Sequence, residues 1–117
     1  MRSLFLAPAL LIAAGAASAE GFTIHDFGTL ATREDCLSKA VKVMEAYRTT
    51  YGGYAVEQVD WVAYGWDLTP GDQDVAILCP VLPDGSFNAF MVVYGETDND
   101  QERESTADRI AAFWGGN

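Results

Sequence analysis

The stretch that decides the fold runs from Val75 to Gly95 and reads VAILCPVL (75–82), PDG (83–85), S (86) and FNAFMVVYG (87–95). Two apolar runs of strand length flank Pro-Asp-Gly, a sequence typical of a tight turn with glycine in a left-handed conformation. The stretch therefore predicts a β-hairpin.

Pairing across this turn sorts the side chains of the hairpin onto two faces. The expected core face carries Val75, Ile77, Cys79, Val81, Phe87, Ala89, Met91 and Val93. The opposite face carries Ala76, Leu78, Leu82, Asn88, Phe90, Val92 and Tyr94. An antiparallel sheet with one solvated face is usually polar on that face, so this apolar one is expected to be covered. The simplest cover is the chain's own second helix or its ends. A homodimer interface and a shallow ligand groove are the alternatives, and Leu78, Phe90, Val92 and Tyr94 form the candidate interaction patch.

Working outward from the hairpin, the remaining elements complete an α+β pattern. A strand is expected over 22–30, followed by a helix from an N-cap at Thr32 to Gly52-Gly53. A further strand is expected over 56–68, and a last helix begins after Asp98 or Asp100. The order β-α-β-β-β-α predicts an antiparallel sheet of three to four strands with two packed helices. Trp61 and Trp66 are expected on opposite faces of the sheet, and the pattern leaves open which of them faces the core.

The first nineteen residues have the layout of a secretory signal peptide. A positive start at Met1-Arg2-Ser3 precedes an apolar run over 4–14, and Ala17-Ser18-Ala19 is a small-x-small cleavage site. The run is shorter than a membrane-spanning helix needs, so we expect cleavage and no stable membrane insertion afterwards. The expected organisation is a signal peptide over 1–19 and a single α+β domain over 20–117, in the periplasm or secreted.

The two cysteines, Cys36 and Cys79, are expected to form an intramolecular disulfide. Export places them in an oxidising compartment, and two cysteines allow only one intramolecular pairing. Their spacing is unlike the Cys-x-x-Cys of a redox pair, and two thiolates with a single histidine make a poor zinc site.

The charge balance excludes one class of partner. The chain has 17 acidic and 7 basic residues, and removal of Arg2 with the leader lowers the net charge from −10 to −11. Nucleic acid requires a cationic surface, and anionic lipid headgroups are disfavoured for the same reason. A basic protein partner or a divalent cation would be attracted, although the same acidity also keeps an exported protein soluble.

The sequence offers little catalytic machinery. His25 is the single histidine, and Ser38, Ser86 and Ser105 lie in no nucleophile-elbow sequence. No cofactor motif is present, so we expect no enzyme, no cofactor and no metal site. The candidate acidic cluster is Asp98, Asp100, Glu102 and Glu104. Its spacing imitates the opening of a calcium loop, but Arg103 stands where the loop needs glycine. The simpler interpretation is an acidic N-terminus of a helix.

The segments Asp35-Cys36-Leu37, Val75–Pro80 and Met91–Gly95 together resemble those of a broad group of small exported bacterial proteins. The resemblance implies the helix-Cys/strand-Cys pair, the β-α-β-β-β-α layout and the exported location, and it implies no activity. The expected function is a small non-enzymatic binding or interaction module with an unknown protein partner or self-association. The alternatives are an acidic inhibitor of a basic exported enzyme and a weak divalent-cation binder.

Overall fold

The computed structural model describes residues 21–96 and 99–116. The expectations for the signal peptide and for Asp98 lie outside this part of the chain. The described residues form five strands and two helices, in the order β-α-β-β-β-β-α along the chain. The α+β class and the antiparallel sheet with two packed helices are confirmed.

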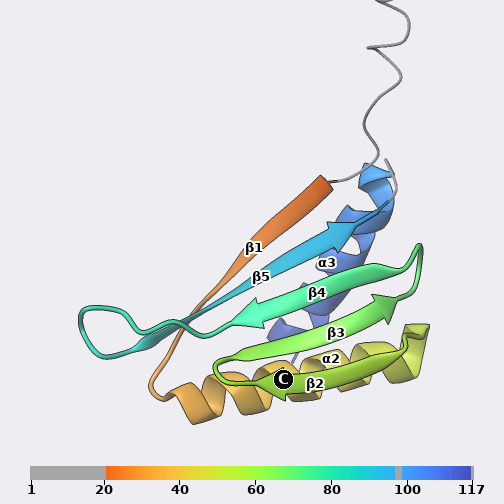
Figure 1. The fold of residues 1–117 in the computed structure, drawn as a ribbon. Coiled ribbons are helices and arrows are strands. Elements are labelled where there is room, and N and C mark those ends of the chain that lie inside the picture. The colour runs from red at the N-terminus through yellow and green to blue at the C-terminus, as the bar shows by residue number, and fades with distance from the viewer. Residues whose placement is uncertain (1–20, 97–98, 117) are drawn as a thin grey trace, which may run out of the picture.

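The sheet has five strands, all paired antiparallel, in the order β1-β5-β4-β3-β2 (Figure 1). The strands are β1 (Gly21–Leu30), β2 (Ala55–Val59), β3 (Val62–Leu68), β4 (Gln73–Leu78) and β5 (Phe87–Gly95). The first strand of the chain therefore lies beside the last, and β1 and β2 are the two edges.

The strand count exceeds the expected three to four because residues 56–68 hold a hairpin rather than one strand. Val59 pairs with Val62, so Asp60 and Trp61 form a two-residue turn. Asp60 has a φ of 53°, a left-handed conformation that aspartate tolerates better than most residues. No glycine, proline or asparagine marks this turn, and the apolar run across it therefore reads as continuous.

The predicted hairpin at the centre of the sheet is confirmed, except that Val81, expected on its core face, is exposed beyond the end of β4. Val75 pairs with Val93 and Ile77 with Met91, as the two-face pattern requires. Gly85 has a φ of 88°, and its N–H donates to the carbonyl of Leu82 at 2.9 Å. Regular pairing of β4 ends at Leu78, before Pro80, which has no N–H to donate.

The first described helix, α2 (Arg33–Tyr51), begins as predicted. Thr32 is the N-cap, and its hydroxyl accepts a hydrogen bond from the N–H of Asp35 at 3.0 Å. Gly52 ends the helix with a φ of 107°. The last helix, α3 (Asp100–Gly115), begins after Asn99 rather than after either aspartate considered above. The amide oxygen of Asn99 accepts from the N–H of Glu102 at 3.2 Å, and asparagine caps a helix as well as aspartate does.

Both helices pack on the same face of the sheet, where Figure 1 shows them together behind the strands. One apolar core joins them to it, with Met44 from α2, Ile110 from α3 and Met91 from β5 all fully buried. Cys36 on α2 forms the expected disulfide with Cys79, just beyond the end of β4, with a Cα–Cα distance of 6.2 Å. The opposite face of the sheet is thereby left without either helix. Among the described helices, none is long and apolar enough to cross a membrane.

Candidate functional site

The face of the sheet away from the helices is mostly apolar and is ordered in rows across the strands. One row runs Ile24, Val92, Ala76, Tyr64, Glu57, and the next runs Asp26, Phe90, Leu78, Val62, Val59. A third row begins Phe22, Tyr94, Asp74, and Trp66 continues it on β3 beside a bulge. We call these residues, together with Asn88, the open face.

The predicted patch of Leu78, Phe90, Val92 and Tyr94 lies together at the centre of the open face. Each of the four is half-buried rather than fully covered. Of the covers considered for this face, the last helix is excluded, because α3 packs against β1 and β5 from the core side, with Ala107 and Ile110 buried there. Cover by the N-terminal end of the chain concerns residues 1–20, which lie outside the described part. The core-side residues of β5 and β1 that α2 does not cover are mostly apolar, and α3 packs on them.

Four residues that sequence reasoning did not assign to the patch enlarge it. Phe22 and Ile24 on the edge strand β1 are 67% and 69% exposed, and the ring of Phe22 lies 5.2 Å from that of Tyr94. Tyr64 and Trp66 on β3 stack with ring centroids 5.0 Å apart and planes 12° apart. The pairing of β1 with β5 and the hairpin turn at Asp60 place these residues here, and neither could be deduced from local pattern.

The hairpin at Asp60 also determines where Trp61 and Trp66 lie. Trp66 lies on the open face, whereas Trp61 lies in the turn, with the guanidinium of Arg33 5.9 Å from its ring centroid. Because Trp61 lies in a turn and not on a strand, the expectation that the two tryptophans occupy opposite faces of one strand does not apply, and neither belongs to the buried core.

Three carboxylates stand among the apolar side chains of the open face, and each is held by a hydrogen bond. Asp26 accepts from the N–H of Gly28 at 2.8 Å across the β1 bulge. Glu57 accepts from the indole N–H of Trp66 at 2.9 Å. Asp74 accepts from the N–H of Asp67 at 3.0 Å. In the described residues, the ion pairs lie within the helices, between Glu45 and Arg48 and between Asp100 and Arg103, so none of the three open-face carboxylates is neutralised by a lysine or arginine.

The charges of the chain are divided between the two layers. Of the 7 Lys and Arg residues, all but Arg2 lie on the helices, namely Arg33, Lys39, Lys42, Arg48, Arg103 and Arg109. The described strands and their turns hold no Lys or Arg, and their carboxylates are Asp26, Glu57, Asp60, Asp67, Asp72, Asp74, Asp84 and Glu96. The helices carry acids and bases in similar number, so most of the negative charge belongs to the sheet layer.

The described members of the predicted acidic cluster do not converge on one point. Asp100 pairs with Arg103. The carboxylate of Glu102 turns toward Gly71 in the β3–β4 turn, and Glu104 accepts from the hydroxyl of Thr23 at 3.3 Å. Within residues 21–96 and 99–116, no group of three or more His, Cys, Asp or Glu side chains has the arrangement of a metal site.

His25, the only histidine, sits half-buried on β1 on the core side of the sheet. Its ring lies 5.1 Å from that of Phe27. The Phe27 ring in turn stacks on Trp114 at 4.6 Å. The histidine therefore lies beside a packing cluster of aromatic rings.

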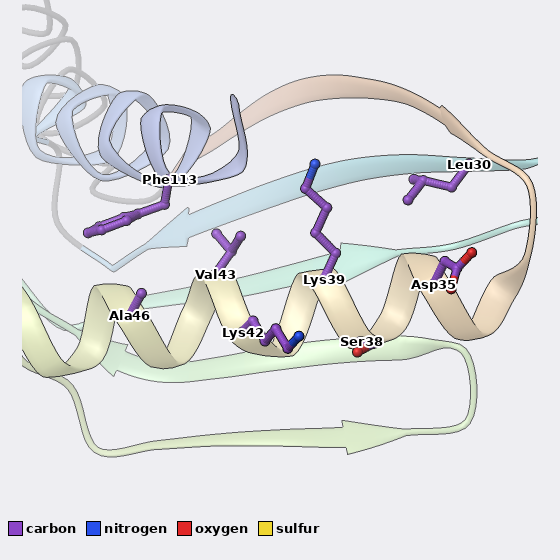
Figure 2. A pocket seen from close by; sticks show the side chains of 8 residues that line it. All are labelled: Leu30, Asp35, Ser38, Lys39, Lys42, Val43, Ala46 and Phe113. Atoms are coloured by element: carbon purple, nitrogen blue, oxygen red, sulfur yellow. The ribbon is translucent and has the colours of Figure 1, made fainter. Parts of the chain in front are cut away.

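A groove of about 600 Å³ opens on the helical side of the molecule, between α2 and the end of α3. Its lining consists of Leu30, Asp35, Ser38, Lys39, Lys42, Val43, Ala46 and Phe113 (Figure 2). Its volume is that of a small-molecule site. The ammonium of Lys39 lies 4.7 Å from the ring centroid of Trp114, and Asp35 also lines the groove.

Comparison with models of protein families, with curated proteins and with solved structures finds no match. Function is therefore inferred from the surface of the chain itself.

Proposed function

We propose that this protein is an exported, non-enzymatic binding module that holds a protein partner on the open face of its sheet. The observation that supports the proposal is an apolar and aromatic sheet face that neither helix covers. Contiguous exposed apolar surface is uncommon on monomeric proteins and usually marks an interaction site.

The composition of the open face fits a protein partner better than a small ligand. Aromatic residues such as Tyr64, Trp66 and Tyr94 are enriched where proteins bind one another. The face is a broad sheet surface, whereas small-molecule sites are concave and enclose their ligand. The exported location is part of the proposal and rests on residues 1–19, and the Cys36–Cys79 disulfide is of the kind that persists in an oxidising compartment.

Site-specific photo-crosslinking in the organism that makes the protein tests this function. A photoreactive phenylalanine analogue replaces Phe22 on the open face or, as the control, Tyr54, an aromatic residue outside that face that is 77% exposed. We expect a discrete crosslinked species from position 22 that is absent from position 54. Crosslinking that is equal at both positions, or absent from both, would contradict the proposal.

A further inference from the structure

We propose that the open face selects a cationic amphipathic segment, with an apolar stripe that covers Val92, Ala76 and Leu78 and with Lys or Arg side chains that reach Asp26, Glu57 and Asp74. This inference rests on the proposed function of the open face as a binding surface, and it adds the chemistry of the partner.

The three carboxylates are already oriented for a cation. Each uses one oxygen to accept from its own chain, at 2.8, 2.9 and 3.0 Å for Asp26, Glu57 and Asp74. The same oxygen of Asp26 also accepts from the amide of Asn88 at 3.4 Å. An ionised carboxylate has about four lone-pair positions, so each can still accept from an ammonium or guanidinium group. Because the side chains are held in advance, less conformational entropy is lost when a cation binds.

The three carboxylates frame an area of the open face that is wider than one helix. Asp26 on β1 and Glu57 on β2 are separated by four strand spacings, or roughly 19 Å. Asp74 lies four residues along β4 from Leu78, which shares the row of Asp26, so the second dimension is roughly 13 Å. A helix with its side chains is about 10–12 Å across, so one lying on β5 and β4 leaves flanking Lys and Arg side chains free to reach the three acids.

Aromatic rings beside these acids favour Arg and Lys further. Tyr94 is the register partner of Asp74, and the irregular segment of β3 that holds Trp66 lies opposite Asp74. Trp66 also contacts Glu57 through its indole N–H. Guanidinium and ammonium groups are attracted to the faces of such rings, which adds to their pairing with a carboxylate.

The three carboxylates of the open face argue against two other binding partners, namely a second copy of the chain and an anionic lipid surface. Two copies of the chain packed through their open faces would bring six unneutralised carboxylates together, since neither face carries a Lys or Arg. An anionic lipid surface meets the same repulsion. A partner with cations around an apolar centre is complementary to both features.

Binding of designed peptides to the exported protein tests the inference. The probe is an 18-residue fluorescent amphipathic peptide with a leucine stripe flanked by arginines, and its partner peptide has glutamine at every arginine position. We expect the arginine peptide to bind at least tenfold more tightly at low salt, a difference of ~1.4 kcal/mol, and to lose much of this advantage at physiological ionic strength.

Isosteric variants locate the effect on the open face. Asp26→Asn, Glu57→Gln and Asp74→Asn together remove the charges but keep the oxygens that accept the three hydrogen bonds. The control combines Glu34→Gln, Glu104→Gln and Asp108→Asn, which change the net charge equally on the helices. We expect about a tenfold loss of arginine-peptide affinity in the first variant, equivalent to ~1.4 kcal/mol, and less than about threefold in the control. Should the triple variant unfold, Asp74→Asn alone is compared with Asp108→Asn.

The outcomes separate this inference from the proposed function. Equal binding of the two peptides, equal losses in the two triple variants, or dimerisation of the protein through the open face in sedimentation would overturn the cationic partner. Failure of both peptides to bind, with crosslinking at position 22 still present, would also overturn it and leave the binding function standing. If position 22 captures nothing as well, both proposals fail.

Discussion

The carboxylate of Glu102 on α3 fills the space beside Gly71 in the β3–β4 turn, where a Cβ atom added to that glycine would overlap Oε2 of Glu102. Gly71 also has a φ of 70°, a conformation that L side chains rarely adopt. A side chain at position 71 would therefore have to displace the end of the Glu102 side chain as well as adopt an unfavourable φ.

We expect Gly71→Ala to destabilise the protein by about 2 kcal/mol, because it combines an unfavourable φ with displacement of Glu102. The measurement is urea unfolding followed by circular dichroism. Gly85→Ala is the matched control, since Gly85 has a φ of 88° and nothing within 4 Å of an added Cβ. Equal losses in the two variants would show that Glu102 does not restrict position 71.

The Cys36–Cys79 disulfide spans a sequence separation of 43 residues. On the chain-entropy model, closing a loop of this length stabilises the folded state by about 4 kcal/mol, so we expect Cys36→Ala with Cys79→Ala to lower the free energy of unfolding by roughly 2–5 kcal/mol. Intact mass without reductant should be lower than the reduced value by the mass of two hydrogen atoms. Two alkylatable thiols in protein purified without reductant would refute the bridge.

A buried hydroxyl anchors the β3–β4 turn to α2. Tyr47 is fully buried, and its OH donates to the carbonyl of Thr69 at 2.5 Å. Tyr47→Phe leaves that carbonyl without this donor, so we expect a loss of about 1–2 kcal/mol in thermal or urea unfolding. Tyr51→Phe on the exposed side of the same helix should change stability by less than about 0.5 kcal/mol. A reversed order of the two losses would contradict the anchoring role.

The sequence alone predicts the local part of this fold well. Thr32 and the spacing of apolar residues after it locate the start of α2, and Pro83-Asp84-Gly85 locates the central hairpin with its register. The two faces of that hairpin follow from the register, so the core positions Ile77 and Met91 are also predictable.

The pairing of strands that are distant in the sequence could not be predicted in the same way. The turn at Asp60 has no glycine to mark it. The pairing of β1 with β5 joins residues from 57 (Leu30 and Phe87) to 74 (Gly21 and Gly95) positions apart, with no turn to fix the register. The sequence therefore did not predict that Phe22 and Trp66 lie on the open face. The segregation of charge between the layers becomes visible only once each charged residue is placed on a helix or a strand.

Asp84 in the hairpin turn has a pKa below its ordinary value, chiefly because the Ser86 hydroxyl donates to its carboxylate at 2.6 Å and secondarily because the Ser86 N–H donates at 2.9 Å. A lowered pKa in the folded state means that Asp84 stabilises the fold above the unfolded-state pKa, and this contribution is lost as the pH falls through the folded value. Ser86→Ala removes the hydroxyl and keeps the N–H. We therefore expect the pKa of Asp84 to rise part of the way toward its ordinary value in a carboxyl NMR titration, and an unchanged pKa would show that the hydroxyl does not matter.

Adjacent valines on β5 test the division of the sheet into a core face and an open face. Val93 is fully buried against the helices, whereas Val92 is half-buried on the open face. We expect Val93→Ala to destabilise the protein by about 2–3 kcal/mol, through lost burial and a residual cavity, and Val92→Ala by about 1 kcal/mol or less. Urea unfolding measures both values. The binding readout should reverse the order, since Val92→Ala removes contact area for the peptide while Val93→Ala leaves the open face unchanged. Equal destabilisation by the two substitutions would mean that Val92 is as fully covered as Val93 and that the face is not open.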